Sequence, residues 1–323
     1  MNPVIIEIYK KLIDYYSKSN SDQDNTYRIQ QTKNILNILI KYPKKITSGS
    51  ELKDIHGIGK KTIARIDEIL TTGTLKELQN INANNEYFEN LQNIFGIGSV
   101  KARELIYDHN IKTVDELRDA YASGKIELPH QIVIGLKYYG LYEQKIKREE
   151  IDKIFIYLKK VANTLDPKLV VEICGSYRRG LLVSNDIDVL IVHDKPYLHK
   201  FIALLKHNEF IIDDLTDKDP ETKYMGFCQY TEADKTYGIH RIDIRYMPPE
   251  SYASALLYFT GSGEFNRKMR GLAKSLGYFL NEYGLYKINH NNDTKKLIKT
   301  ETEQDIFHKL GLEYVPPTKR NIF

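Results

Sequence analysis

The chain of 323 residues is 41% apolar, 28% charged and 11% aromatic, with a formal net charge of +4 at pH 7. Its length predicts two or more packed units, because one small core does not extend over so many residues. No apolar run approaches the roughly 18 residues of a membrane span, which excludes an integral membrane protein of the helical kind. Cys174 and Cys228 lie in strand-like stretches, where we expect buried, reduced thiols and therefore a reducing compartment.

The first 80 residues are predicted to be helical and basic. The opening stretch MNPVIIEIYKKLIDYY is amphipathic and lacks the apolar core and cleavage site of a signal peptide, so we expect no secretion. Apolar residues at helical spacing predict another helix over 27–42. Residues 1–80 hold 13 Lys and Arg against 9 Asp and Glu, whereas the rest of the chain balances at 34 of each. This excess favours a polyanionic partner, although scattered lysines are also typical of an ordinary solvated surface.

One motif occurs twice, as LKDIHGIGKKTIARIDEIL over 52–70 and LQNIFGIGSVKARELIYDH over 91–109. Each copy predicts a short helix, a Gly-Ile-Gly turn and a second helix. The glycines let the turn approach a phosphate, and the start of the second helix attracts the anion. A single copy is equally compatible with a plain tight hairpin, but two copies followed by basic residues indicate sequence-independent binding of a DNA backbone. The residues expected at this contact are Gly57, Gly59, Lys60, Lys61, Gly96 and Gly98.

From residue 165 onward the pattern changes from helices to strands. β-rich segments alternate with polar turns, and one helix is predicted over 195–210. After Pro248 and Pro249 the chain returns to helix and then ends in a short strand and turn. The expected order is therefore two helical modules, a sheet-based unit and a smaller C-terminal unit.

Three aspartates in the strand-like region are the strongest chemical signal. Asp186 and Asp188 flank one isoleucine, and the alternation of a strand puts both on one face. Asp243 lies in the second strand HRIDIRY, where Arg241 and Arg245 share its face. Three neighbouring carboxylates raise one another's pKa values unless a cation neutralises them, and two divalent ions at such a site promote in-line phosphoryl transfer. The alternative, solvated edge-strand aspartates, does not explain the motif GSYRRG just before the pair.

That motif predicts a phosphate cradle. Gly175 and Ser176 would form a turn whose N–H and hydroxyl groups meet phosphate oxygens, with Arg178 or Arg179 adding charge-assisted bonds. Arg148 is a further candidate, although an arginine at a domain junction is as often an ordinary ion-pair partner.

GSYRRG with DID, then RIDIR and YFTGSGEFNRKMR, in this order resemble the nucleotidyltransferase core of the family X DNA polymerases. The resemblance extends over nearly the whole chain and includes both hairpins, IGLKYYG over 134–140 and the closing EQDIFHKLGLEYVPP. It implies an α+β multidomain fold whose palm contains a mixed sheet. The implied parts are a lyase-like DNA-binding domain over 1–80, a second helix-hairpin-helix subdomain over 81–147, a nucleotidyltransferase palm over 148–249 and a nucleotide-selection subdomain over 250–323.

The resemblance also implies an activity, which is template-directed filling of short gaps in base excision repair by two-metal nucleotidyl transfer. It implies two Mg²⁺ ions, or Mn²⁺, with Na⁺ or K⁺ at the hairpin turns. The implied partners are gapped or nicked duplex DNA, deoxynucleoside triphosphates and a repair ligase or endonuclease, and we expect a monomer. The short loop over 231–238 favours templated synthesis, and we expect no additional N-terminal phosphopeptide-binding domain. Abundant Asn, Ile, Lys and Tyr are typical of AT-rich coding, as in a large DNA virus or a protist, so we expect the nucleus or a viral factory.

Individual roles follow from the resemblance position by position. Asp186 and Asp188 would bind both metals, Asp243 would join the catalytic metal and take the primer hydroxyl proton, and Arg241 would restrain Asp243. The residues implied around the incoming nucleotide are Arg148, Gly175, Ser176, Arg179, Asn185, Asp186, Tyr258, Phe259, Gly261, Gly263 and Asn266. Tyr258, Phe259 and Gly261 would disfavour a ribose hydroxyl. The residues implied to contact DNA are Lys223, Arg245 and Arg270, and the carbonyls implied to hold monovalent cations are those of Lys53, Ile55, Ile58, Gln92, Ile94 and Ile97.

The lyase position departs from the family pattern. Arg65 stands where the family's deoxyribose-phosphate lyase has its Schiff-base lysine, and a protonated guanidinium cannot replace that amine. Thr32 and Glu77 stand in place of a tyrosine and another lysine, whereas Lys61, one helical turn before Arg65, is retained. We therefore predict that lyase activity is lost or weak, with Lys61 as the fallback nucleophile.

Two other departures lie in the nucleotide pocket, and two other functional classes remain open. Asn185 replaces a glycine and Gly263 an acidic residue, changes that we expect to shift nucleotide affinity and fidelity. A nucleotidyltransferase acting on RNA or a small molecule is one alternative, and the tandem hairpins argue against it. A catalytically inactive DNA-end scaffold is the other, but it would have lost a metal carboxylate, and all three aspartates are present.

Overall fold

The computed structural model describes residues 2–18, 23–142, 145–216, 221–289 and 294–321. The chain divides into two compact units. The first comprises Met1–Asn93 and Ile97–Lys125, and the second comprises Ile94–Gly96 and Ile126–Phe323. Within the described ranges no helix is both long enough and apolar enough to cross a membrane.

The first unit is helical, as its hydrophobic periodicity predicted. Its elements are α1 (Pro3–Lys18), α2 (Gln23–Lys41), the 3₁₀ helix η1 (Gly49–Leu52), α3 (Lys60–Thr72), α4 (Lys76–Gln92), α5 (Ser99–Tyr107) and α6 (Val114–Ala122). Side chains three and four positions apart on α1, such as Ile5, Tyr9 and Leu12, pack against Leu39 and Ile66 in one apolar core. This core positions α3, which carries Arg65.

Both predicted hairpins are present in the described residues. The first joins η1 to α3 and the second joins α4 to α5. The chain adopts positive φ angles at Gly57 (+94°) and Gly96 (+90°), a conformation that a side chain would disfavour. Backbone geometry therefore explains the first glycine of each Gly-Ile-Gly, whereas Gly59 and Gly98 adopt ordinary negative φ angles.

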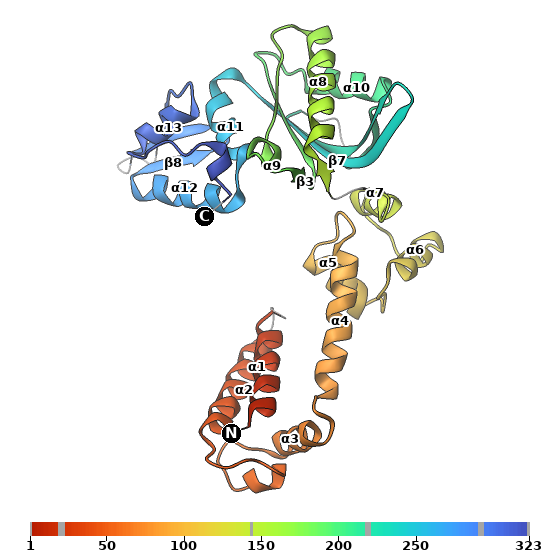
Figure 1. Ribbon diagram of the computed structural model, residues 1–323, viewed down its shortest axis with the longest axis vertical. Helices are drawn as coiled ribbons and strands as arrows, with labels where there is room; N and C mark the ends of the chain where they lie inside the picture. The colour runs from red at the N-terminus through yellow and green to blue at the C-terminus, as the bar shows by residue number, and fades with distance from the viewer. Residues whose placement is uncertain (1, 19–22, 143–144, 217–220, 290–293, 322–323) are drawn as a thin grey trace. The chain divides into compact units, whose positions relative to one another are not determined.

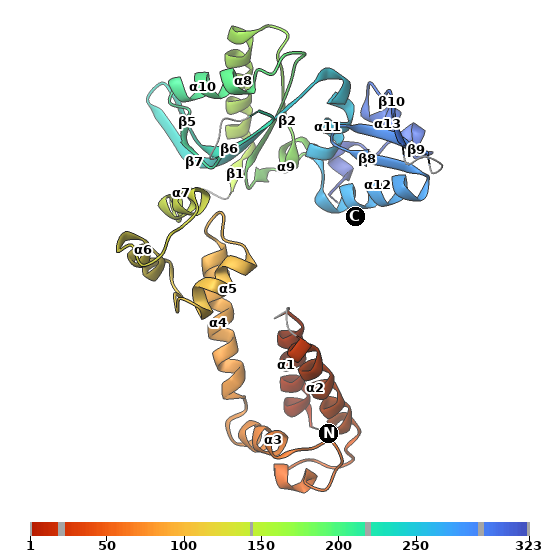
Figure 2. The same ribbon diagram turned by 180° about the vertical axis from the view of Figure 1, so that it is seen from behind.

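The second unit contains a five-stranded mixed sheet in the order β2-β4-β7-β6-β5. Its strands are β2 (Val170–Ile173), β4 (Ile187–Val192), β5 (Ile211–Asp214), β6 (Lys223–Glu232) and β7 (Lys235–Met247). Only β4 and β7 of this sheet run parallel. Figure 1 and Figure 2 show α8 (Arg148–Leu165) and α10 (Leu198–His207) on one side of the sheet, where they bury its main core. The opposite face is partly covered, around Leu190 and Met247 and around Phe227.

Shorter elements surround this sheet. They are α7 (His130–Tyr138), β1 (Ile146–Lys147), α9 (Gly175–Arg178) and β3 (Val183–Ser184), with β1 pairing β3. We predicted a turn at Gly175 and Ser176, and the structure instead forms the short helix α9 there. The reason is that Arg178 and Arg179 donate backbone hydrogen bonds to the carbonyls of Cys174 and Gly175. Cys174 and Cys228 are buried free thiols, as expected.

The C-terminal part of the second unit packs around its own small core. Its elements are η2 (Pro249–Ser251), α11 (Tyr252–Thr260), α12 (Gly263–Ser275), β8 (Tyr278–Asn281), β9 (Gly284–Asn289), β10 (Thr294–Ile298), α13 (Glu303–Lys309) and η3 (Pro317–Lys319). The strands form an antiparallel sheet, more regular than the predicted strand-and-turn ending. Leu257, Phe265, Leu285 and Phe307 meet beneath it. The α+β class with a mixed sheet, predicted from the sequence, is confirmed.

Candidate active site

The three aspartates meet on the open face of the palm sheet. In the parallel pair of strands, Asp188 of β4 lies directly opposite Asp243 of β7. Asp186 precedes β4 on the same side, and one carboxylate oxygen from each residue lies within 4.8 Å of the others. The intervening Ile187 and the neighbouring Ile242 and Ile244 point into the core under α8. Because alternate residues of a strand face opposite sides, burying the isoleucines leaves the aspartates together on the other side.

Arg241 bridges two of these carboxylates. Its Nη2 contacts the Asp186 carboxylate and lies 3.5 Å from Oδ2 of Asp243. We expected Arg241 to restrain Asp243, but the tighter partner is Asp186. The sequence could not predict this preference. Asp243 lies on the same strand as Arg241, whereas Asp186 comes from the loop before β4, and only the packing of the two strands determines which carboxylate lies nearer.

The electrostatics of the cluster favour a cation. Burial, followed by the charges of Asp186 and Asp243, raises the pKa of Asp188 to about 7. Burial also raises the pKa of Asp243, against the opposing effect of Arg241. Oδ1 of Asp243 is buried without a hydrogen-bond partner among the described residues. A set of carboxylate oxygens with an unsatisfied acceptor suits a hard divalent ion such as Mg²⁺ or Mn²⁺, so the residues fit the predicted metal.

The raised pKa of Asp188 predicts that the metal-free protein loses stability as pH rises. A carboxyl group with a higher pKa in the folded chain binds more protons when folded, so its ionisation opposes folding. This penalty is absent below the ordinary value of 3.8 and complete above about 7. We expect Asp188→Asn to increase the free energy of unfolding by about 4 kcal/mol at pH 8 and to change it little at pH 4. Urea unfolding in EDTA measures both, and equal stability at pH 8 would contradict the prediction.

A cavity of about 290 Å³ adjoins the carboxylates. It brings together all of the predicted nucleotide residues except Arg148, namely Gly175, Ser176, Arg179, Asn185, Asp186, Tyr258, Phe259, Gly261, Gly263 and Asn266, together with Asp188. Asn266 Nδ2 donates to the Tyr258 carbonyl at 2.7 Å and so ties α12 to α11. These residues come from both the palm and the C-terminal part, and the cavity lies between them within the second unit.

Close packing explains the glycine of the cradle. A Cβ at Gly175 would clash with the carboxylate of Asp188, and its φ is +52°. Only glycine therefore lets α9 approach the metal site. Asn185, which stands where the family has a glycine, is not among the described non-glycine residues that adopt a positive φ. Replacing glycine at this position consequently carries no left-handed strain.

Arg148 lies outside the lining of the cavity. Its Nη1 donates to the Tyr177 carbonyl at 2.7 Å, and its guanidinium lies 4.1 Å from the centre of the Tyr177 ring. Arg148 thus packs against Tyr177 of α9. Its expected contact with a phosphate stays a prediction.

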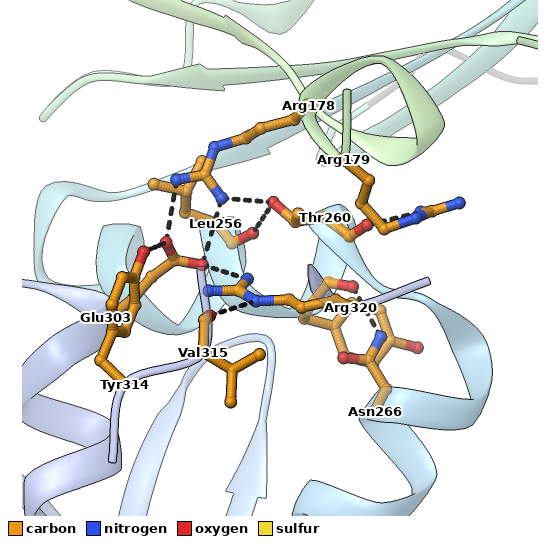
Figure 3. Close-up of polar contacts among 10 residues, drawn as sticks. Arg178, Arg179, Leu256, Thr260, Asn266, Glu303, Tyr314, Val315 and Arg320 are labelled. Atoms are coloured by element: carbon orange, nitrogen blue, oxygen red, sulfur yellow. Dashed lines mark hydrogen bonds and ion pairs between the residues drawn. The ribbon is translucent and has the colours of Figure 1, made fainter. Parts of the chain in front are cut away.

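The adjacent arginines of α9 have different partners (Figure 3). Arg179 lines the cavity and donates to the Thr260 carbonyl and to Oδ1 of Asn321, both at 2.6 Å. Arg178 points the other way and pairs with Glu303 at 2.8 Å. The sequence offered either arginine as a phosphate contact, and the structure leaves Arg179 as the candidate.

Arg178 belongs to a buried polar network that sequence reasoning missed. Glu303 accepts from Arg178, from Arg320 at 2.7 Å and from the Tyr314 hydroxyl at 3.2 Å (Figure 3). Arg178 also donates to the Thr260 hydroxyl at 2.7 Å. The Arg320 side chain is fully buried. The network connects α9, the helix of the predicted phosphate cradle and hereafter the cradle helix, to α11 and α13. No local motif could reveal it, because Arg178 and Glu303 are 125 positions apart.

Known protein families match the chain in four successive segments. Their descriptions are a helix-hairpin-helix domain over residues 1–75, the fingers domain of DNA polymerase lambda over 89–140, the DNA polymerase beta palm over 145–249 and the DNA polymerase beta thumb over 255–321. DNA polymerase lambda of Rattus norvegicus is 32% identical over 330 residues, which cover 98% of this chain. DNA polymerase lambda of Arabidopsis thaliana is 29% identical over 344 residues, which cover all of it.

The chain belongs to the family X DNA polymerases. It spans 56% and 62% of the lengths of these two relatives, less than two thirds of either.

Two of the predicted DNA contacts of this family X chain, Lys223 and Arg245, lie on the strands beside Asp243. Lys223 of β6 pairs in register with Arg245 of β7, two positions beyond Asp243. Arg245 lies 5.5 Å from the ring centre of Phe259. Arg270 lines a small recess with Asn266 and Tyr258. Their contacts with DNA stay predictions. The binding of monovalent cations by carbonyls of the two hairpin turns also stays a prediction. Among these carbonyls, that of Ile55 accepts a hydrogen bond from the Ile58 N–H at 3.0 Å.

At the lyase position of this family X chain, Arg65 forms a closed ion pair. Its Nη2 lies 2.5 Å from Oε2 of Glu77 and 3.2 Å from the Tyr16 hydroxyl, and that hydroxyl donates to the other Glu77 oxygen at 2.6 Å. Burial alone would raise the pKa of Glu77, but Tyr16 and Arg65 together lower it below its ordinary value. Arg65 and Glu77, two of the residues that depart from the family pattern, are therefore ion-pair partners. Tyr16 was not identified from the sequence, since its relevance depends on the packing of α1 against α3 and α4.

Proposed function

We propose that the chain is a template-directed DNA polymerase that fills short gaps by two-metal transfer of a nucleotide to a primer 3′-hydroxyl. The observation that supports this most is the parallel register of β4 and β7, with Asp188 opposite Asp243 beside the cavity. The tandem hairpins favour duplex DNA over a small-molecule acceptor. Gapped or nicked DNA and deoxynucleoside triphosphates are the proposed substrates, and base excision repair is the proposed context.

The chain's own residues divide the work. Asp186, Asp188 and Asp243 would hold two Mg²⁺ ions, which when bound lower the pKa of the attacking hydroxyl and stabilise the leaving pyrophosphate. Arg241 keeps the carboxylates of Asp186 and Asp243 in place. Ser176 and Arg179 would bind phosphate oxygens with a hydroxyl and a guanidinium.

Sugar selection is proposed for α11. Tyr258 and Phe259 line the cavity, and their rings meet edge to face at a centroid distance of 5.2 Å. Gly261 and Gly263 line the same wall without side chains. A rigid aromatic edge at the sugar would exclude a ribose 2′-hydroxyl by sterics, so discrimination against ribonucleotides is expected.

We infer that the first unit has lost deoxyribose-phosphate lyase activity. The guanidinium of Arg65 remains protonated and is neutralised by Glu77, and neither side chain offers a free amine. Lys61 is exposed on the same helix and is the one lysine retained from the expected pattern. End trimming would then require a separate enzyme before a ligase can seal the gap.

One experiment tests both proposals. A one-nucleotide gap carrying a 5′-deoxyribose phosphate is incubated with enzyme, Mg²⁺ and deoxynucleotide, while a parallel sample is treated with borohydride to trap any Schiff base. We expect extension by one nucleotide without a trapped adduct. An adduct that is trapped in the wild-type chain but not in Lys61→Ala would show that the lyase is active and that Lys61 is its nucleophile. Tight DNA binding without extension would instead indicate an inactive DNA-end scaffold.

A further inference from the structure

Phe95 brings the second hairpin turn against the arginine of the metal site. It lies between Ile94 and Gly96, and these three residues belong to the same compact unit as the palm. The guanidinium carbon of Arg241 lies 5.0 Å from the centre of the Phe95 ring. A cation facing an aromatic ring at this distance is attracted by the negative face of the ring. Phe95 therefore contacts the arginine that bridges Asp186 and Asp243.

The fold holds Phe95 firmly on both its backbone and its side chain. A Cβ at Gly135 of α7 would clash with the Phe95 carbonyl oxygen, so glycine is required for α7 to lie against the turn. The Phe95 ring packs against a cluster of Ile134, Tyr138, Leu215 and Phe227. A ring held by a close-packed cluster keeps one orientation.

The same cluster continues along the sheet to the carboxylates. Phe227 pairs in register with Arg241, and Met225 pairs with Asp243. Residues opposite one another in an antiparallel pair share a face. The aromatic cluster and the metal site are therefore neighbouring parts of one surface, and Arg241 stands at their boundary.

The ion pairs of Arg241 to described residues use one nitrogen of its guanidinium. Its Nη2 is shared between Asp186 and Asp243, while its Nε is buried and has no hydrogen-bond partner in the part of the chain that the structure describes. A guanidinium held from one end could swing over the carboxylates and compete with a metal ion for the same oxygens. The ring of Phe95 is positioned to oppose that movement.

We propose that Phe95 is the positioning residue of Arg241, and that through it the second hairpin turn controls the geometry of the metal-binding carboxylates. The coupling to DNA rests on the proposed function, because it requires a DNA phosphate at Gly96 and Gly98. Gly96 directly follows Phe95, so a phosphate bound at that glycine would be held at a fixed place relative to the ring and to Arg241. Seating of the DNA backbone and readiness of the metal site would then be linked.

The test measures Mn²⁺ binding to the full chain by calorimetry, without DNA, and primer extension on gapped DNA. Phe95→Leu should weaken Mn²⁺ binding about 3- to 10-fold and lower kcat by a similar factor, in keeping with the strength of a partly buried cation–ring contact. The KM for the nucleotide should change less. Phe95→Tyr, which keeps the ring, should restore both values.

Matched controls separate positioning from general packing. Tyr142 belongs to the same cluster, with its ring 5.4 Å from that of Phe227, so Tyr142→Leu removes an equivalent ring elsewhere and should leave Mn²⁺ binding unchanged. Thermal unfolding of each variant checks the fold, and Phe95→Met replaces the Leu variant if that one does not fold. In an Arg241→Ala background, Phe95→Leu should have no further effect.

The outcomes distinguish this inference from the proposed function. If the wild-type chain does not extend a primer, the proposed polymerase activity fails, and the Mn²⁺ titration still decides the role of Phe95. If the wild-type chain extends but Phe95→Leu or Phe95→Met binds Mn²⁺ as tightly as wild type, the positioning role is overturned. An equal loss in Tyr142→Leu would also overturn it, since packing alone would then explain the effect.

Discussion

Asp243→Asn is expected to lower the single-turnover rate of primer extension by a factor on the order of 10³ or more, consistent with removal of one member of a catalytic set. The substitution keeps the size of the side chain and removes its charge. Asp243 lies opposite Asp188 and supplies a buried oxygen without another partner, so a metal ion shared by the cluster loses a ligand that no neighbour can replace. Extension of a gapped primer with Mg²⁺ in rapid quench measures the effect.

A matched control comes from the same chain region. Asp234 lies exposed at the tip between β6 and β7, and Asp234→Asn should extend the primer at the wild-type rate. Binding of gapped DNA, measured by fluorescence anisotropy, should be similar for both variants, because neither residue is proposed to contact the backbone. An Asp243→Asn variant within about twofold of the wild-type rate, a difference of less than 1 kcal/mol, would refute the metal assignment.

Glu303→Gln is expected to decrease the free energy of unfolding by about 3 kcal/mol, the cost of breaking a buried ion pair from one side. The change leaves the guanidinium groups of Arg178 and Arg320 facing a neutral amide, and Arg320 is fully buried. Burial alone would raise the pKa of Glu303, but the two arginines lower it below its ordinary value. A lowered carboxyl pKa contributes stability above the ordinary value of 4.5, which is lost as pH falls through the lowered value.

Urea unfolding of both forms at pH 7 measures this loss, and the difference between wild type and Glu303→Gln should shrink only in acid. Glu301→Gln is the control, because Glu301 is exposed and its pair with Lys299 at 2.8 Å lies on the surface. Such a pair contributes at most about 1 kcal/mol. We also expect the nucleotide KM of Glu303→Gln to rise, since Arg178 holds the cradle helix that carries Ser176 and Arg179. Stability equal to the control would contradict the network's role.

Much of the site could be predicted from short stretches of sequence. Asp186 and Asp188 are two positions apart in a strand, so the pleat alone puts them on one face, and the isoleucines around them identify which face is buried. The glycine turns of the two hairpins follow from local backbone conformation in the same way. Such predictions succeed because they depend on periodicity over a few residues.

The sequence by itself thus determined the family, the helical and strand regions, the three carboxylates and the loss of a lysine at position 65. Only the tertiary structure decided that Arg179 and not Arg178 faces the cavity, and that Arg241 holds Asp186 more closely than Asp243. It also decided that Glu77 neutralises Arg65. The physical reason is that an ion pair or ring contact depends on which distant side chain packing brings within a few ångströms, and local periodicity determines a residue's face but not its partner.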